Sequence, residues 1–579
     1  MRLLKKLPLL LLVWCACVPV GHSSGVAPVR APHAMVASVH ALASAAGLEA
    51  MRQGGNAVDA AVATGFALAV VHPQAGNIGG GGFMLLRRDD GTARFIDFRE
   101  TAPAAASRDM YLDPSGNVIP GASTLGYRAV AVPGSVAGLV FAQSKYGKLP
   151  LPKVMAAAIQ LAREGFVLAA EDARDFRDGG LTQFPESRRI FQRDGNLYHA
   201  GDLFRQPELA RTLERIAQNP LDFYRGGIAK ELASWVHEHG GLISEQDLSS
   251  YKVQEREPVR GTYRGYDIIS APPPSSGGIT LIELLNILEG YNLAKLGAGS
   301  AEAIHLTTEA YRRAFFDRAE LLAGDPDFAR VPVAQLIDKR YAAAWRESLN
   351  PDHATQSTAL QRPTGVLDKL DQVAAVEPTH TTHYSVIDGD GNAVAVTTTL
   401  NDTLGAHVVA GPLGFLLNDE MDDFTSKPGS PNMFGLLQSD GNAIGPGKRP
   451  LSAMAPTIVL DHGKLFMVVG SRGGPRIITS VANVLLGVID YGLNIQQAVD
   501  APRFHHQWMP DALRVEENGF SPDTLKLLKA MGHNVERGVI DAGQHSPYWS
   551  EVECVAIDQR TGDRLGASDY RGNGKAVGY

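Results

Sequence analysis

The sequence predicts an α+β fold, because antiparallel hairpins and long helical segments occupy different parts of the chain. Residues 381–387 and 393–401 are rich in β-forming residues and flank a turn of Asp, Gly and Asn, which is a strong hairpin pattern. Residues 457–470 predict a second hairpin. From Val130 to Asn350 the pattern is mostly helical.

The composition is that of a globular protein. Hydrophobic residues make up 44% of the 579 residues and charged residues 20%, and the chain is longer than one ordinary core requires. The net charge of −8, without a long basic stripe, argues against nucleic-acid binding.

The N-terminus predicts an export signal over residues 1–25. A positively charged start precedes the apolar run 9–18, which is too short for a comfortable membrane span, and no other stretch could cross a bilayer. Cys15 and Cys17 leave a poor lipoprotein-type site as an alternative. Both cysteines would be removed with the signal peptide. The exported protein, periplasmic or secreted, would then keep only Cys554 and form no internal disulfide.

Two helices open the exported chain. Residues 40–52 are Ala-rich and helical, and Gly54 and Gly55 end this helix. Asn56 is placed to cap a second helix over residues 57–71. This second helix is apolar on nearly all sides, so we expect it to be buried.

Two strands follow a run of four glycines. Residues 79–82 predict a tight turn that leads into a strand at 83–86, and a second strand covers 93–98. Arg99 stands at the end of the second strand in a loop bounded by proline. It is placed to face a cleft, although a solvated surface arginine fits this pattern equally well.

The hairpin at 381–401 is preceded by a polar, aperiodic stretch. Residues 350–380 predict a flexible connector, either an ordinary linker or a segment that lies over a site. A cut before Thr381 would give this residue both a hydroxyl and a free α-amine. That amine has a pKa near neutrality, so it can act as the base for its own side chain. The alternative is a hairpin whose hydroxyls merely favour strands.

Two later segments offer opposite charges to a ligand. Residues 418–424 are acidic, which indicates either a cation or ammonium site or a solvated turn. Gly473 and Gly474 precede an apolar helix at 477–486, and such glycines present backbone N–H groups to a carboxylate or a transient oxyanion. Their spacing does not match a dinucleotide-binding loop.

Metal and phosphate sites are weakly indicated at most. The run 79–82 is not followed by the Gly-Lys-Ser/Thr of a phosphate loop. The spacing within 418–424 does not fit a twelve-residue calcium loop. His505 and His506 have no apparent third ligand, so a structural role is favoured over a metal site.

Together these segments resemble the γ-glutamyltranspeptidase family, also called glutathione hydrolases. The resemblance covers essentially the whole exported chain. The motifs that carry it are Gly54–Ala60, Gly79–Gly82, Asp97–Glu100, Thr381–Val386, Asn418–Phe424, Lys448–Ser452, Gly470–Gly474 and Pro502–Gln507.

The resemblance implies an N-terminal-nucleophile hydrolase with a four-layered αββα sandwich. The precursor would cut itself between His380 and Thr381. This would give a large subunit of residues 26–380 and a small catalytic subunit of residues 381–579, which share one core as a heterodimer. No metal or organic cofactor is implied.

The resemblance also assigns the reaction. Thr381 would be the nucleophile, supported by a hydrogen bond from Thr399, and the amides of Gly473 and Gly474 would form the oxyanion hole. A γ-glutamyl group taken from glutathione or a related compound would pass through Thr381 to water, or to the amine of an amino acid or dipeptide.

The implied substrate pocket would bind a zwitterion. Arg99 and Ser452 would hold the α-carboxylate of the glutamyl group, and Asn401, Glu420 and Asp423 would hold its α-ammonium. An arginine fork suits a carboxylate, and acidic side chains suit an ammonium group.

One departure from the family pattern leaves alternatives open. Many members have two serines after Pro-Leu, whereas this chain has Ser452 and then Ala453, which removes a hydrogen bond worth about 1 kcal/mol. One alternative is therefore a cephalosporin or glutaryl acylase, although Glu420 and Asp423 would then lack an ammonium partner. Another is an unprocessed exported binding protein for glutathione-like peptides, which the intact Thr381 argues against.

Overall fold

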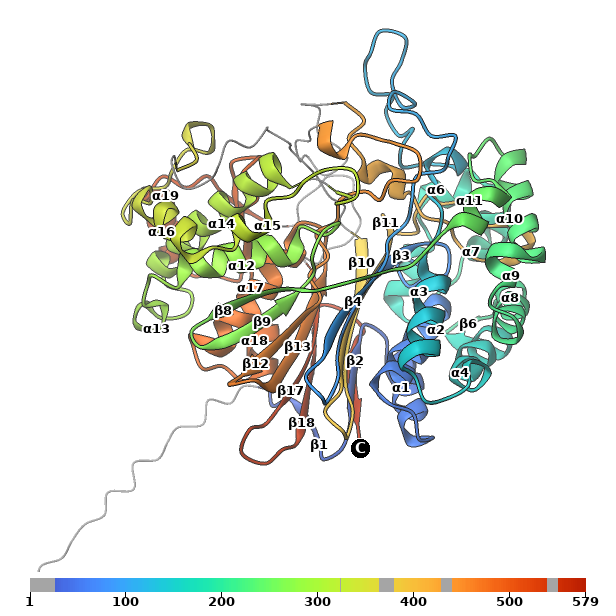
Figure 1. Ribbon diagram of the computed structural model, residues 1–579, viewed down its shortest axis with the longest axis horizontal. Helices are drawn as coiled ribbons and strands as arrows, with labels where there is room; N and C mark the ends of the chain where they lie inside the picture. Colours follow the sequence, from blue (N-terminus) through green and yellow to red (C-terminus); the bar gives the residue numbers. More distant parts are fainter. Residues whose placement is uncertain (1–25, 323, 364–379, 428–439, 539–549) are drawn as a thin grey trace, which may run out of the picture.

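Two seven-stranded antiparallel sheets are stacked face to face, and helices cover the outer face of each (Figure 1). This arrangement confirms the predicted α+β class and the four-layered αββα sandwich. The computed structural model describes residues 26–322, 324–363, 380–427, 440–538 and 550–579. The predicted export signal, residues 1–25, lies outside this part of the chain.

Both sheets combine strands from before and after residue 380. In spatial order, the first sheet contains β1 (Val29–Ala31), β18 (Arg564–Ser568), β17 (Glu551–Ile557), β13 (Lys464–Arg472), β12 (Thr457–Asp461), β9 (Tyr266–Ser270) and β8 (Val259–Tyr263). The second contains β19 (Lys575–Gly578), β2 (Met35–Ser38), β10 (His380–Ile387), β11 (Ala393–Asn401), β3 (Gly81–Arg87), β4 (Ala93–Phe98) and β7 (Gln254–Arg256). Small sheets pair β5 (Phe166–Val167) with β6 (Leu203–Phe204), and β15 (Leu513–Val515) with β14 (Phe504–His505) and β16 (Val535–Arg537).

The helices form the two outer layers. On the side of the second sheet are α1 (Ala41–Arg52), α2 (Ala57–Val71), α3 (Ser135–Tyr146), α4 (Leu151–Glu164), α5 (Ala170–Asp175), α6 (Gly179–Thr182), α7 (Pro185–Gln192), α8 (Pro207–Gln218), α9 (Asp222–Arg225), α10 (Gly227–Glu238) and α11 (Glu245–Ser250). On the side of the first sheet are α12 (Gly277–Leu288), α13 (Leu293–Leu296), α14 (Ala301–Leu321), α15 (Val333–Leu336), α16 (Lys339–Glu347), α17 (Arg476–Ile489), α18 (Ile495–Asp500) and α19 (Pro522–Ala530). Among the described helices, none is both long enough and apolar enough to span a membrane.

The hairpin expected at 381–401 forms the centre of the second sheet as β10 and β11. Side chains alternate along both strands, as a pleated strand requires. Tyr384 and Val396 join the core beneath α1 and α2, whereas Ile387 and Ala395 join the core between the sheets. This strand pair therefore contributes to both hydrophobic layers.

The two predicted N-terminal helices are confirmed as α1 and α2. The side chain of Asn56 accepts hydrogen bonds from the backbone N–H groups of Val58 (3.0 Å) and Asp59 (3.1 Å). The carboxylate of Asp59 accepts from the backbone N–H of Asn56 at 2.8 Å, which completes a capping box. Every residue of α2 is buried, as its all-round apolar sequence predicts.

One hairpin lies inside the region that the sequence predicts to be mostly helical. β8 and β9 are joined by Arg264 and Gly265, whose φ angles are 52° and 88°. Two-residue hairpin turns often require positive φ at both central positions, and Asn-Gly is their usual signal. Because arginine is not typical of such turns, the sequence pattern does not indicate this hairpin.

Residues 350–363, the first part of the expected connector, pack against the later half of the chain. The backbone N–H of Ser357 donates to the Asp511 carboxylate at 2.7 Å, and the indole N–H of Trp508 donates to the Ser357 carbonyl at 3.0 Å. Ser357 is buried. Residues 364–379 lie outside the described part of the chain.

The glycine run before β3 allows two backbones to approach closely. A Cβ atom on Gly80 would come within 2.0 Å of the Thr399 carbonyl oxygen, and one on Gly82 within 2.4 Å of the Thr397 carbonyl oxygen. These positions are therefore glycine because β3 enters the sheet against the backbone of β11, in addition to any need for a turn.

We predict that Gly80→Ala destabilises the protein. The added methyl group must push apart β3 and β11, and overpacking of this kind costs about 1–3 kcal/mol. The apparent melting temperature of purified Gly80→Ala should fall by several degrees. Gly179→Ala is the matched control, because a Cβ atom there meets no other atom within 4 Å. Equal melting temperatures for both variants would contradict this account.

Candidate functional site

Thr381 and Thr399 lie directly opposite each other on β10 and β11. Opposite residues of an antiparallel pair lie on the same face, with Cβ atoms about 4.5–5.5 Å apart. Thr381 is only 2% exposed, and its Oγ1 makes no hydrogen bond with another described residue. The expected nucleophile is therefore a buried hydroxyl next to a second hydroxyl.

The pairing of β10 with β11 is irregular at the expected cleavage bond. His380 lies opposite Asn401, while Thr381 lies opposite Thr399, so Leu400 has no opposite residue. Asn401 adopts a positive φ of 83°. Such a bulge bends the strand and changes the direction of its side chains, and bulges are frequent next to active sites.

Gly473 and Gly474 form the turn between β13 and α17, with φ angles of 123° and 58° that favour glycine. The start of β10 packs against the end of β13, because the His383 ring lies so close to Gly470 that a methyl group there would come within 2.2 Å of it. Thr381 is two residues from this contact along β10, and the glycine pair begins three residues beyond it along β13. The predicted nucleophile and the predicted oxyanion donors thus lie near one junction of the two sheets.

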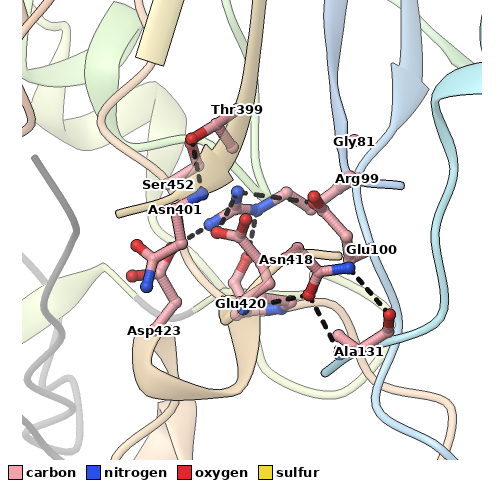
Figure 2. Close-up of polar contacts among 12 residues, drawn as sticks. Gly81, Arg99, Glu100, Ala131, Thr399, Asn401, Asn418, Glu420, Asp423 and Ser452 are labelled. Atoms are coloured by element: carbon pink, nitrogen blue, oxygen red, sulfur yellow. Dashed lines mark hydrogen bonds and ion pairs between the residues drawn. The ribbon is translucent and has the colours of Figure 1, made fainter. Parts of the chain in front are cut away.

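Arg99 follows the end of β4, and its guanidinium lies against the acidic turn η5 (Glu420–Asp423), as Figure 2 shows. Its side chain is fully buried. Its Nη1 lies 2.5 Å from Glu420 Oε1, and its Nη2 pairs with the Asp423 carboxylate. Nη2 also donates to the Leu451 carbonyl at 2.9 Å, and Nε donates to the Pro450 carbonyl at 3.4 Å. Arg99 is therefore an interior residue, and the alternative of a solvated surface arginine is wrong.

Glu100 is a third acidic residue of this cluster, and it was not among the binding residues predicted from the sequence. Its Oε2 lies 3.6 Å from Arg99 Nη1, and its side chain is fully buried. Burial, together with the nearby Glu420 carboxylate, raises the pKa of Glu100 well above its usual range. Gly81 makes room for it, since a Cβ atom there would come within 2.4 Å of Glu100 Oε2. Its position beside Arg99 is the only signal in the sequence.

Two asparagines hold the acidic segment in place. The side-chain oxygen of Asn418 accepts hydrogen bonds from the backbone N–H groups of Ala131 (2.9 Å) and Glu420 (3.0 Å). Asn401 Nδ2 donates to the Asp419 carbonyl at 3.0 Å. Asn401 Oδ1 is buried without a hydrogen-bond partner among the described residues. It is therefore an acceptor available to a ligand.

Ser452 lies at the arginine side of the cluster. It directly follows Leu451, whose carbonyl accepts from Arg99, and it is buried. Its Oγ accepts a weak hydrogen bond from the Met454 N–H at 3.3 Å. The next residue, Ala453, offers no hydroxyl.

The two neighbouring histidines have protein partners. His505 contacts the Thr479 hydroxyl at 2.9 Å and the Gln507 side chain at 2.8 Å, and His506 Nε2 lies 3.1 Å from the Asp511 carboxylate. In the described part of the chain, no group of three or more potential ligands could hold a metal ion. These contacts support the structural role expected for this pair.

The predicted substrate-binding residues thus form one buried cluster, Arg99, Asn401, Glu420, Asp423 and Ser452 (Figure 2). The cluster is joined to the hairpin because the backbone N–H of Asn401 donates to Thr399 Oγ1 at 2.8 Å. It combines one guanidinium with several carboxyl groups, out of contact with water. Such a site can accept a small ligand that carries both charges.

Known proteins share both the sequence and the architecture of this chain. A family model described as Gamma-glutamyltranspeptidase matches residues 43–579. The glutathione hydrolase proenzyme of Escherichia coli (strain K12) is 51% identical over 512 residues, which cover 88% of this chain and 87% of that protein. The acylase ACY 1 proenzyme of Pseudomonas sp. (strain V22) is 36% identical over 559 residues, covering 95% of this chain and 94% of that protein.

Two solved structures extend the comparison. The cephalosporin acylase from Bacillus halodurans superimposes with a TM-score of 0.82 at 26% identity, covering 96% of this chain and 98% of that one. The gamma-glutamyltranspeptidase of Helicobacter pylori has a TM-score of 0.56 at 42% identity, covering 61% of this chain and 99% of that one. The buried cluster, the fold and these similarities agree, and the chain belongs to the gamma-glutamyltranspeptidase family.

Proposed function

We propose that this chain is a precursor that cleaves itself before Thr381 and then transfers or hydrolyses γ-glutamyl groups, with glutathione and related compounds as donors. The main support is the fully buried contact of Arg99 with Glu420 and Asp423. An amino-acid head group carries a carboxylate, which can pair with Arg99, and an ammonium group, which can pair with Glu420 and Asp423. Such a ligand can replace each protein–protein ion pair with a protein–ligand pair, so no buried charge is left alone.

Three features support self-cleavage. The bond before Thr381 lies at the bulge of β10, where the strand pairing is irregular. The relatives at 51% and 36% identity are both named proenzymes. The Helicobacter pylori chain is covered almost completely yet matches 61% of this chain, which is close to the share of the proposed large subunit, residues 26–380.

The proposed subunits, residues 26–380 and 381–579, would stay together after cleavage. The second sheet places β10, β11 and β19 of the small subunit beside β2, β3, β4 and β7 of the large one. Separation would expose sheet edges and both hydrophobic cores. The processed protein would therefore be a heterodimer in which each subunit supplies part of the site.

The proposed reaction needs only groups of this chain. The free α-amine of Thr381 accepts the proton of its own hydroxyl, which attacks the γ-carbonyl. The amides of Gly473 and Gly474 stabilise the oxyanion. Thr399 lies opposite the nucleophile, although the hydrogen bond expected between their side chains is not formed in this structure. The amide nitrogen leaves with a proton, and a γ-glutamyl ester forms. Water or an acceptor amine then attacks this ester and restores Thr381.

A second candidate is an acylase that takes a glutaryl group, which lacks the α-amine. The observation in its favour is Ala453, where the family pattern has a second serine, together with the similarity to acylases at up to 36% identity. Against it stand the buried Glu420 and Asp423, which would face no ammonium group. A site built for an ammonium group discriminates strongly against analogues that lack it.

We further propose that residues 1–25 direct export to the periplasm or the outside. The support is the charged start and the short apolar run in the sequence.

We expect Thr381→Ala to yield a single uncleaved chain without activity, because it removes the hydroxyl that attacks both the peptide bond and the substrate. Mass spectrometry and a γ-glutamyl anilide assay measure the two results. Thr382→Val is the matched control: Thr382 faces the opposite side of β10, and its Oγ1 has no hydrogen-bond partner among the described residues. A cleaved or active Thr381→Ala variant would assign the nucleophile elsewhere.

We expect the wild type to cleave γ-glutamyl p-nitroanilide with a kcat/KM at least about 100-fold above that for glutaryl p-nitroanilide. Arg99→Lys should raise KM for the γ-glutamyl donor roughly tenfold or more, because lysine cannot reproduce the two-pronged contact of the guanidinium. Steady-state kinetics measure both.

Arg94→Lys, in β4 just before Arg99, is the control for this experiment, because the Arg94 side chain is 35% exposed and forms surface ion pairs that contribute little. Its KM should equal that of the wild type. A preference for the glutaryl substrate would establish the acylase instead. An unchanged KM in Arg99→Lys would remove Arg99 from the pocket.

A further inference from the structure

Arg99 and Asp423 of the buried cluster form a closed ring of polar contacts with two further buried residues, Asn442 and Leu451. Asn442 Nδ2 donates to the Asp423 carbonyl at 2.6 Å, and Asn442 Oδ1 accepts from the Leu451 N–H at 3.0 Å. The Leu451 carbonyl accepts from Arg99 Nη2 at 2.9 Å, and the same nitrogen pairs with the Asp423 carboxylate. The ring therefore returns to the residue at which it began.

Each member of this ring is shielded from water. Asn442, Arg99 and Asp423 have no exposed surface, and Leu451 is 1% exposed. Buried backbone groups need hydrogen-bond partners. The side-chain amide of Asn442 supplies such partners to one backbone carbonyl and one backbone N–H. Asn442 joins the backbone of Asp423 to that of Leu451 through these two hydrogen bonds.

Asn442 is itself held from both sides. Lys448 Nζ donates to the carbonyl of Gly441 at 2.7 Å and to that of Ala443 at 3.0 Å, the two neighbours of Asn442. The carbonyl of Asn442 accepts from the Thr425 N–H at 2.9 Å. These contacts hold the backbone at Asn442, so that its side chain points toward the Asp423 carbonyl and the Leu451 N–H.

We propose that Asn442 is a positioning residue of this enzyme, which sets the carboxylate of Asp423 against the guanidinium of Arg99. This inference rests on the proposed function, in which Asp423 binds the α-ammonium and Arg99 the α-carboxylate. Asn442 touches neither the substrate nor the reacting atoms. It acts on Asp423 by holding the Asp423 carbonyl, while the Leu451 N–H fixes the oxygen of the same amide.

This role predicts a loss of discrimination between donors. A displaced Asp423 weakens the hold on the ammonium group, so substrates that carry this group lose more than substrates that lack it. General loosening of the fold would affect both kinds of substrate equally. Chemistry at Thr381 should be unaffected, because the hydrogen bonds of Asn442 described above run to Asp423, Leu451 and Thr425 and none of these residues belongs to β10.

The test uses Asn442→Ala in the full chain with γ-glutamyl and glutaryl p-nitroanilides. We expect KM for the γ-glutamyl donor to rise at least tenfold while kcat stays within threefold. The kcat/KM for the glutaryl substrate should stay within threefold, and the inhibition constant of L-glutamate should rise in parallel with KM. Mass spectrometry should show normal cleavage before Thr381.

A double-mutant cycle with Asp423→Asn tests the route of action. In the Asp423→Asn background, Asn442→Ala should change KM less than threefold. If Asn442→Ala folds poorly, Asn442→Asp provides the same test, because it keeps an acceptor for the Leu451 N–H and loses the donor to the Asp423 carbonyl. Asn286→Ala is the matched control, since Asn286 is also buried and its Nδ2 donates to the Ile337 carbonyl at 2.8 Å, away from the site.

An equal fall in kcat/KM for both substrates would overturn the proposal, and so would an unchanged KM or an undiminished effect in the Asp423→Asn background. Failure of the proposed function is a separate result. It would appear in the wild type, as absence of γ-glutamyl activity, before any variant is measured.

Discussion

The contact of Arg99 with Glu420 and Asp423 is the interaction on which the rest of the site depends. Charges without access to water are costly unless they are paired, and removal of one partner leaves an uncompensated buried charge. In this contact the carboxylates outnumber the cation, because one guanidinium faces two carboxylates. A ligand that brings both an ammonium group and a carboxylate can place its carboxylate against Arg99 and its ammonium group against Glu420 and Asp423. Burial and the nearby Glu420 carboxylate raise the pKa of Glu100, which disfavours a further negative charge at this cluster.

The cluster can form because strands that are distant in the sequence are neighbours in the second sheet. β4, which leads into Arg99, is separated from β11 only by β3. β11 ends at Asn401, beside the acidic turn, and is paired on its other side with β10, which contains Thr381. The glycine run before β3 permits this close arrangement. The pocket and the expected nucleophile therefore lie at the same end of the second sheet, and movement of β10 or β11 would disturb both.

Local signals in the sequence were sufficient for much of the fold. The Asn56 cap, the apolar helix α2 and the central hairpin could be predicted because their signals lie within a few residues of one another. The hairpin of β8 and β9 could not, since its Arg264-Gly265 turn lacks the usual asparagine. In the site, the opposite charges of Arg99 and the acidic turn suggested a zwitterion pocket. Their direct pairing, the buried Glu100 and the bridging Asn442 depend on how distant loops converge, which no local pattern indicates.

The proposed function depends on self-cleavage before Thr381, and the intact mass and N-terminal sequence of the purified wild-type protein test this cleavage most directly. We expect two chains that remain associated, the smaller of which begins at Thr381. A single intact chain after prolonged incubation would contradict the account, because Thr381 would then have no free α-amine to act as its base.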